Sequence, residues 1–278
     1  MAELRELLHE AQARLAAAGV AHARADAEAL LLAALGRPRA FLYAHPEAKA
    51  AAREQEEFAR LITARAAGQP LQYLLGRQNF FGRDFEVTPA VLIPRPETEL
   101  VVAAALEKLA PGQMARAADA GAGSGAIAVT LALERPAARV AALDRSAAAL
   151  AVARRNAARW GARVAFVVAD WLAPVRGETL DLIVANPPYV ADDELASLAR
   201  EVRDYEPRAA LVSGPTGLEA YEKLVPQAAL ALRPGGWLIL EIGYRAGDGV
   251  RALLGRWRDV ETRRDWQGWE RVVVARRG

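Results

Sequence analysis

Two short stretches in the second half of the chain bring together residue types that can bind a cofactor and hold a substrate nitrogen. The first reads Asp119-Ala120-Gly121-Ala122-Gly123-Ser124-Gly125 and leads into a helical pattern. Glycines allow tight turns and close approach of the backbone to a ligand, and the N-terminus of the following helix attracts negative charge. The stretch therefore predicts a cofactor-binding loop, which consists of Gly121, Ala122, Gly123, Ser124 and Gly125.

The spacing of the glycines leaves two cofactor classes open. Gly121, Gly123 and Ala126 also satisfy the G-x-G-x-x-G/A pattern of dinucleotide-binding proteins. Asp144 ends the next expected strand and could bind the two hydroxyls of a ribose, or could be a solvated acid. A glycine-rich turn that serves only packing is the structural alternative.

The second stretch is Asn186-Pro187-Pro188-Tyr189, which follows a later apolar segment. Prolines fix φ and lack an amide N–H, so the string presents carbonyl groups that can only accept hydrogen bonds. Asn186 adds a side-chain carbonyl, and Tyr189 offers a flat ring on which a planar amide or base can pack. We expect Asn186, Pro187 and Tyr189 to be catalytic, and these three with Pro188 to bind the substrate. The alternative is a proline pair that only ends a strand.

The elements that must position these residues begin near Pro94. Short apolar segments alternate there with helical patterns, which is typical of a parallel sheet with helices on both faces. We expect strands at 115–119, 139–144, 163–169, 180–185 and 236–242. Helices are expected at 98–109, 125–134, 146–159, 216–232 and 246–255, and a terminal antiparallel pair at 257–262 and 270–276.

Three parts are expected along the chain. Residues 1–77 repeat apolar residues at helical spacing with glycine and proline breaks, which predicts a small bundle of about four helices. Residues 78–93 change to aromatic and β-branched residues around a turn and predict a hairpin that links two domains. Residues 94–278 form the domain that carries both stretches.

Composition narrows the possible chemistry. The 278 residues include no cysteine, and the histidines are His9, His22 and His45. Disulfides, thiolate nucleophiles and cysteine-based metal sites are excluded, and we expect no metal and no serine-histidine chemistry in the second domain. A net charge of +2 gives no support to direct nucleic-acid binding. We expect a cytoplasmic monomer without membrane contact.

Together the two stretches resemble the class I S-adenosylmethionine methyltransferases, whose loop after the fourth strand reads N/D-P-P-Y/F and which methylate planar nitrogens. Among them, the chain looks like the glutamine methyltransferases of class I peptide chain release factors. That similarity extends to Ile93-Pro94-Arg95-Pro96-Glu97-Thr98-Glu99, to Asp170-Trp171 and to the helical N-terminal part. It implies a Rossmann-like doubly wound α/β sheet with a terminal antiparallel pair, preceded by a small helical-bundle domain and a β-hairpin linker.

The resemblance also implies roles for individual residues. The loop Gly121–Gly125 would cradle the methionine part of S-adenosylmethionine, and Asp144 would bind its ribose. Asp170 and Trp171 would frame the adenine, with a core tryptophan at a strand end as the alternative for Trp171 read alone. Asn186 would lie beside the donated methyl group. Residues 94–99 would either face the cofactor or only cap a helix.

The same resemblance implies the partner. The methyl acceptor would be the glutamine side chain in the Gly-Gly-Gln motif of a class I release factor, docked with help from the helical domain. A ribosomal-protein glutamine methyltransferase and a nucleic-acid amino-group methyltransferase are the alternatives. A nucleotide-binding dehydrogenase would need a hydride-relay histidine that the second domain lacks, and a non-enzymatic interaction module would leave Asn186-Pro187-Pro188-Tyr189 unexplained.

Overall fold

The computed structural model describes residues 2–278, which divide into two compact units. The first, here called the helical unit, contains the residues up to Gly76 together with Ala199–Tyr205. The second, the sheet unit, contains Arg77–Leu198 and Glu206–Gly278. The chain therefore passes between the units three times, and the sequence pattern gave no sign of the two later crossings.

The helical unit is built around leucines and a phenylalanine that recur at helical spacing. Leu15, Leu30, Leu61 and Phe58 are buried in its core. Gly36 ends one helix in the left-handed conformation, which glycine adopts without a steric penalty. Its helices are α1 (Leu4–Ala17), α2 (Ala23–Leu35), α3 (Arg39–Ala44), α4 (Ala52–Ala66), α5 (Leu71–Leu75) and α9 (Arg200–Tyr205).

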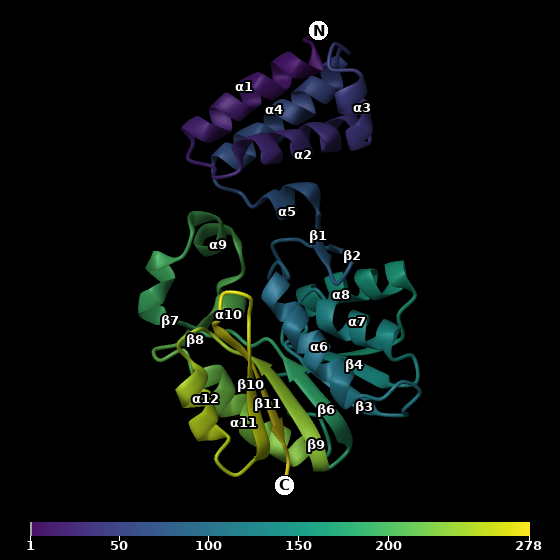
Figure 1. The fold of residues 1–278 in the computed structure, drawn as a ribbon, viewed down its shortest axis with the longest axis vertical. Helices are drawn as coiled ribbons and strands as arrows, with labels where there is room; N and C mark the ends of the chain where they lie inside the picture. The colour runs from purple at the N-terminus through teal and green to yellow at the C-terminus, as the bar shows by residue number, and fades with distance from the viewer. Residues whose placement is uncertain (1) are drawn as a thin grey trace. The chain divides into compact units, whose positions relative to one another are not determined.

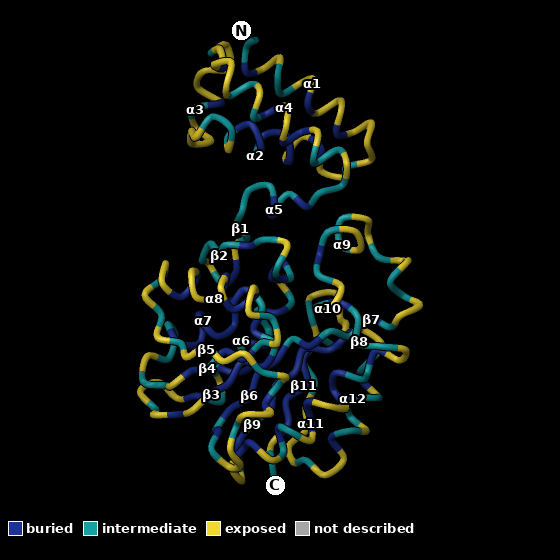
Figure 2. The backbone as a smooth tube through the Cα atoms, turned by 180° about the vertical axis from the view of Figure 1, so that it is seen from behind, coloured by how far each residue is buried: buried dark blue, intermediate teal, exposed yellow. Residues whose placement is uncertain are grey.

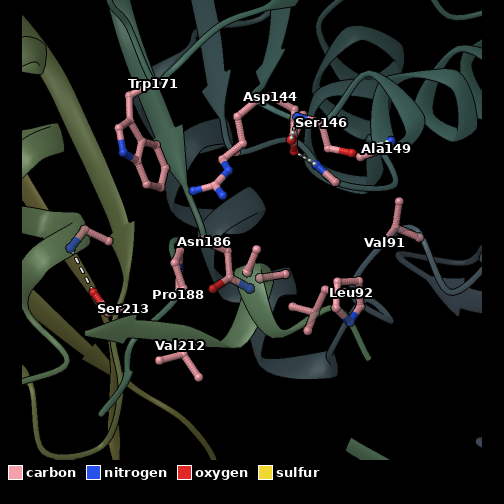
Figure 3. Close-up of a pocket in the computed structure, with 18 of the residues that line it drawn as sticks. Val91, Leu92, Asp144, Ser146, Ala149, Trp171, Asn186, Pro188, Val212 and Ser213 are labelled. Atoms are coloured by element: carbon pink, nitrogen blue, oxygen red, sulfur yellow. Dashed lines mark hydrogen bonds between the residues drawn. The ribbon is translucent and has the colours of Figure 1, made fainter. Parts of the chain in front are cut away.

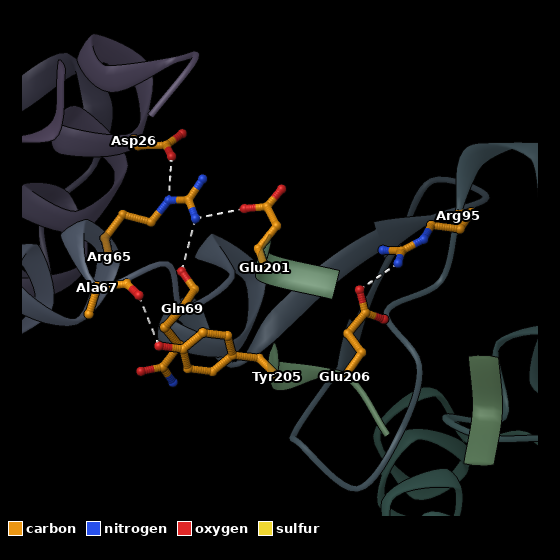
Figure 4. A network of polar contacts seen from close by, with 8 residues as sticks. All are labelled: Asp26, Arg65, Ala67, Gln69, Arg95, Glu201, Tyr205 and Glu206. Carbon is orange, nitrogen blue, oxygen red and sulfur yellow. Dashed lines mark hydrogen bonds and ion pairs between the residues drawn. The ribbon is translucent and has the colours of Figure 1, made fainter. Parts of the chain in front are cut away.

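A half-buried arginine on α4 contacts α9 within the helical unit (Figure 4). The Arg65 guanidinium donates to Asp26 Oδ2 at 2.7 Å, to Glu201 Oε2 at 2.7 Å and to the Gln69 carbonyl at 3.0 Å. The Tyr205 hydroxyl donates to the carbonyl of Ala67 at 3.1 Å. Residues far apart in the sequence are thus joined by charge-assisted hydrogen bonds.

The sheet unit contains a seven-stranded sheet in the order β10-β11-β9-β6-β3-β4-β5. The five strands β3, β4, β5, β6 and β9 run parallel, while β11 pairs antiparallel with β9 and β10. This confirms the expected doubly wound sheet with a terminal antiparallel pair. The strands are β3 (Arg116–Ala120), β4 (Arg139–Asp144), β5 (Val164–Val168), β6 (Leu180–Ala185), β9 (Leu232–Glu241), β10 (Arg258–Arg264) and β11 (Glu270–Arg276).

Helices cover both faces of the sheet (Figures 1 and 2). Alternate strand residues are buried in two separate hydrophobic cores, one on each face. Leu182 and Val184 pack with α6 (Glu99–Lys108), α7 (Ala126–Glu134) and α8 (Ala147–Trp160). Ile183 and Ala185 pack with α11 (Glu219–Ala231) and α12 (Gly247–Leu253) on the other face. Because successive strand residues point to opposite faces, a strand buried on both sides reads as one continuous apolar run.

The hairpin after Gly76 is shorter than expected and is more than a linker. It consists of β1 (Arg77–Phe80) and β2 (Arg83–Glu86), so most of the expected range 78–93 is not strand. Phe80 and Phe85 are buried in the core that contains α6 and α7, which is why the hairpin groups with the sheet unit.

Several short elements near the carboxyl ends of the strands were not expected from the sequence. They are η1 (Pro96–Thr98), β7 (Val190–Ala191), η2 (Asp192–Ser197), α10 (Arg208–Leu211) and β8 (Val212–Gly214). The two short strands β7 and β8 pair in parallel. Among residues 2–278 no helix has the length and apolar character needed to cross a lipid bilayer.

Candidate functional site

A cavity of about 650 Å³ lies in the sheet unit, beside the loops that follow β3, β4, β5 and β6. Ligands of doubly wound proteins bind at this edge of the sheet, where the direction of strand order reverses. In this sheet the reversal falls between β3 and β6. Asp144, Trp171, Asn186 and Leu92 are among the lining residues (Figure 3).

The glycines of the loop at residues 121–125 differ in their surroundings: two pack closely against other residues, and one faces open space. Gly121 and Gly125 have positive φ, and a Cβ on them would lie 3.2 Å from the Trp171 ring and 2.9 Å from the Ala153 Cβ, respectively. Gly123 also has positive φ, yet a Cβ there would meet no other atom within 4 Å. Packing therefore excludes a side chain at Gly125 and leaves little room at Gly121, whereas Gly123 faces space that a ligand can fill.

Asp144 holds the glycine loop as well as lining the cavity. Its Oδ2 accepts from the N–H of Gly123 at 2.9 Å, and its Oδ1 accepts from the N–H of Ser146 at 2.8 Å. The sequence indicated either a ribose-binding role or a solvated acid, because a hydrogen bond to a loop cannot be read from spacing. Each carboxylate oxygen has a second lone pair, so Asp144 can still accept from a ligand hydroxyl.

Asp119 lies beneath the same loop and is fully buried. Its Oδ2 accepts from the Ala128 N–H at 3.0 Å, which satisfies one of the free donors at the start of α7. Its Oδ1 has no hydrogen-bond partner among the described residues. Burial raises the pKa of the Asp119 carboxyl to about 7, because removal from water penalises the charged form.

Asn186 lies at the end of β6 in a chain of three polar side chains. Its Nδ2 is 3.1 Å from Thr98 Oγ1, to which it donates, and the Thr98 hydroxyl donates to Glu241 Oε2 at 2.6 Å. Asn186 and Thr98 both line the cavity. Burial raises the pKa of Glu241 to about 7. Glu241 was not among the expected site residues, although an acid at the end of the apolar run of β9 was a usable signal.

The four residues from Asn186 to Tyr189 are not all brought to the cavity. Within the described chain, the lining includes Asn186 and Pro188 but neither Pro187 nor Tyr189. The Tyr189 ring instead packs beside Gly243, where a Cβ would lie 3.0 Å from the tyrosine Cδ2. Burial raises the pKa of the Tyr189 hydroxyl well above its usual range. One edge of the ring is therefore packed against the protein itself.

Asp170 and Trp171 both line the cavity after β5. Trp171 has φ +53°, a conformation that is strained for a bulky residue, and its ring lies over Gly121. Backbone strain of this kind persists only where the surroundings hold it in place. Trp171 is thus fixed against the glycine loop and is also exposed to the cavity.

The stretch before α6 forms another wall of the cavity. Pro94 and Thr98 are lining residues, whereas Glu97 is not among the described ones that line it. The Glu206 side chain is buried, accepts from the Ile93 N–H at 3.1 Å and forms an ion pair with Arg95 (Figure 4). These contacts fix the wall to the segment that leads into α10.

Comparisons with known proteins agree with this geometry. The model of the PrmC N-terminal domain matches residues 6–76, and that of the methyltransferase small domain matches residues 98–203. A Pyrococcus furiosus methyltransferase shares the fold, with a TM-score of 0.52 at 20% identity over 80% of this chain and 98% of that one. A T. thermophilus 16S rRNA methyltransferase gives a TM-score of 0.53 at 20% identity, covering 73% of this chain and 50% of that one.

Full-length relatives are considerably more similar. The release factor glutamine methyltransferase of Moorella thermoacetica is 50% identical over 281 residues, which covers 99% of this chain and 98% of that protein. The release factor glutamine methyltransferase of Koribacter versatilis is 43% identical over 276 residues, again covering 99% and 98%. The chain therefore belongs to the release factor glutamine methyltransferase family.

Proposed function

We propose that this protein transfers the methyl group of S-adenosylmethionine to the side-chain amide nitrogen of the glutamine in the Gly-Gly-Gln motif of class I peptide chain release factors. Membership of the family supports the reaction. The observation that carries the proposal is the position of Asn186, whose Nδ2 donates to Thr98. Its Oδ1 is therefore left to accept a hydrogen bond from a substrate amide at the cavity wall.

The residues of the cavity fit the cofactor. The open space beside Gly123 suits the methionine part, Asp144 can accept from ribose hydroxyls, and Asp170 with Trp171 can frame the adenine. A cavity of about 650 Å³ is also within the usual range for such ligands. When bound, the cofactor supplies a methyl group on a positively charged sulfur, which is a strong electrophile.

The protein's task is to prepare the acceptor nitrogen. An amide nitrogen is a poor nucleophile, since its lone pair is delocalised into the carbonyl. In this proposal the Asn186 side-chain oxygen and the Pro187 carbonyl accept the two amide N–H groups and orient the lone pair. Orientation of this kind can contribute about 7–11 kcal/mol, and the two acceptors also stabilise positive charge that develops on nitrogen.

No strong base is needed before the reaction, because the amide proton becomes acidic only as the new bond forms. Tyr189 is fixed beside Gly243, so its contribution is to hold the loop rather than to act as a base. The proposal also includes docking of the release factor with help from the helical unit, a monomeric state, a cytoplasmic location, and no direct binding of nucleic acid or membrane.

The test is methyl transfer from radiolabelled S-adenosylmethionine to a purified class I release factor. The factor with its Gly-Gly-Gln glutamine replaced, a ribosomal protein fraction and an RNA fraction are the parallel acceptors. We expect label on the intact factor and none on the substituted one. Label on the ribosomal or RNA fraction alone would contradict the proposed acceptor.

Asn186→Ala tests the role of the amide. We expect it to abolish transfer while the dissociation constant for the cofactor, measured by calorimetry, changes little. Asn79→Ala is the matched control, because Asn79 is an exposed asparagine on the hairpin with a hydrogen bond only to Asp84 among the described residues. Unchanged transfer by Asn186→Ala would overturn the assignment.

A further inference from the structure

We propose that Thr98 and Glu241 are positioning residues that set which end of the Asn186 side-chain amide faces the cavity. This inference rests on the proposed function, since it concerns the acceptor oxygen of Asn186. It is carried by the unbroken chain of hydrogen bonds from Asn186 Nδ2 to Thr98 Oγ1, at 3.1 Å, and from Thr98 to Glu241 Oε2, at 2.6 Å.

The direction of these two hydrogen bonds follows from which of the three side chains can donate and which can only accept. An ionised carboxylate can only accept, so the single hydroxyl proton of Thr98 is committed to Glu241. The Thr98 oxygen then has only lone pairs to offer Asn186, and only the NH₂ end of that amide can pair with them. Asn186 Oδ1 is thereby directed away from Thr98, on the side where a substrate amide would donate.

Because Thr98 and Glu241 are buried, one orientation of the Asn186 side-chain amide is strongly favoured over the flipped one. Thr98 is 4% exposed and Glu241 is 2% exposed, so bulk water is a poor substitute for a lost partner. If the Asn186 amide were flipped, two oxygen lone pairs would meet at Thr98, and the NH₂ group would face the NH₂ of the substrate. Leaving buried polar groups without partners is costly, so the flipped orientation is strongly disfavoured.

Glu241 sits at the end of β9, among groups of both signs. Glu97 disfavours the ionised form of Glu241, Arg95 and Arg271 favour it, and the carboxylate also raises the pKa of the nearby Tyr189 hydroxyl. The Tyr221 hydroxyl donates to the main-chain carbonyl of Glu241 at 3.0 Å and so fixes the strand end without using the carboxylate.

This arrangement predicts that the rate of methyl transfer depends on whether Glu241 is protonated. A protonated carboxyl can donate to Thr98, which frees the Thr98 hydroxyl proton for Asn186 Oδ1 and permits the amide to flip. Since burial raises the pKa of Glu241 to about 7, methyl transfer should decline as the pH falls below that value.

The first test compares Thr98→Val with Thr98→Ser in the full-length protein. Valine keeps the shape but removes the hydroxyl, so we expect kcat for transfer to the release factor to fall by roughly 10- to 100-fold, a loss typical of one hydrogen bond to a charged network. The KM for the cofactor should remain nearly unchanged. Serine restores the hydroxyl and should restore most of kcat. Equal kcat for Thr98→Val and the wild type would overturn the inference.

A matched control separates positioning from folding. Thr130 is fully buried on α7, and its hydroxyl has no hydrogen-bond partner among the described residues. Thr130→Val therefore repeats the same substitution in a core without touching Asn186, and we expect kcat to stay at the wild-type value. A parallel loss in Thr130→Val and Thr98→Val would assign both effects to general destabilisation and would contradict the inference.

The second readout is independent of the acceptor protein. The side-chain ¹H–¹⁵N signals of Asn186 should shift as the pH passes through the titration of Glu241, and the shift should vanish in Glu241→Gln and in Thr98→Val. If the wild type transfers no methyl group but shows this titration, the proposed function fails and the positioning inference stands. If the wild type is active and the Asn186 signals do not respond, the inference fails alone.

Discussion

The buried side chain of Asn156 on α8 donates a hydrogen bond of 2.9 Å to the carbonyl of Ser124 in the glycine loop. The same amide donates to the Glu86 carbonyl at 3.0 Å and accepts from the Glu86 N–H at 2.7 Å. One asparagine therefore ties the hairpin, a helix and the cofactor loop together, which explains why the hairpin is part of the sheet unit.

Asn156→Ala should destabilise the sheet unit and weaken cofactor binding. The substitution leaves the Ser124 carbonyl and the Glu86 backbone without partners, which costs about 1–3 kcal/mol for each buried group. Arg155→Ala is the neighbouring control, because its ion pair with Glu86 is exposed to solvent and contributes little to stability. Urea unfolding and calorimetry of the cofactor measure both effects. Similar unfolding midpoints for the two variants would contradict this role for Asn156.

Gly125→Ala should mainly reduce the stability of the fold, whereas Gly123→Ala should mainly reduce the affinity for the cofactor. A Cβ at Gly125 would lie 2.9 Å from the Ala153 Cβ, which is too close for two carbon atoms. The positive φ of an alanine costs roughly 1 kcal/mol by itself, and the steric overlap should make Gly125→Ala lower the free energy of unfolding by several times that amount. A Cβ at Gly123 meets no protein atom within 4 Å, so Gly123→Ala should fold but bind the cofactor more weakly. Thermal unfolding with and without cofactor separates the two, and equal stability of both variants would refute the distinction.

Much of the sheet could be predicted because buried strands are apolar runs bounded by helical patterns. The expected ranges 139–144 and 180–185 match β4 and β6. The strand expected at 236–242 begins earlier, at Leu232, because Pro234-Gly235-Gly236 resembles a turn in the sequence. In the structure a register shift between Leu180 and Leu182 accommodates these residues within β9.

The site residues that belong to a short sequence motif could be predicted, whereas contacts between residues far apart in the sequence could not. Asp144, Trp171 and Asn186 all line the cavity as expected. The Thr98–Glu241 hydrogen bond joins residues 143 positions apart, and no local pattern encodes such a contact. The short α9 was missed for a related reason, since its attachment depends on Arg65 rather than on an apolar stripe.

Arg65→Met should strongly destabilise the helical unit. Arg65 and Asp26 have side chains 11% and 8% exposed, so loss of the guanidinium leaves a buried carboxylate without its partner. Breaking one side of such a pair costs about 3–5 kcal/mol. The same change at Arg60, whose ion pair with Glu57 on the same helix is open to solvent, should cost far less.

Urea unfolding measures this difference, and limited trypsin digestion reports on α9. Since Glu201 loses its bond to Arg65, cleavage after Arg200 should become faster in Arg65→Met than in Arg60→Met. Equal cleavage rates would show that α9 is held by other contacts.

Asp119→Asn should flatten the pH dependence of stability. Burial raises the Asp119 pKa from 3.8 to about 7, so between these values the folded protein holds a proton that the unfolded chain has released. The free energy of unfolding must then fall as the pH rises through this window, by about 1.4 kcal/mol for each unit of pKa difference. Asparagine cannot titrate, and its Oδ1 can still accept from the Ala128 N–H.

The measurement is urea unfolding of the wild type and Asp119→Asn at about pH 5, about pH 6 and about pH 7.5. Glu241 has a similarly raised pKa and remains in the variant, so we expect the slope to fall by roughly half rather than to vanish. Glu241→Gln should remove the other half, and the double substitution should leave little dependence in this range. An unchanged slope in Asp119→Asn would mean that the Asp119 carboxyl stays ionised in the folded protein between about pH 5 and about pH 7.5, which would contradict the prediction.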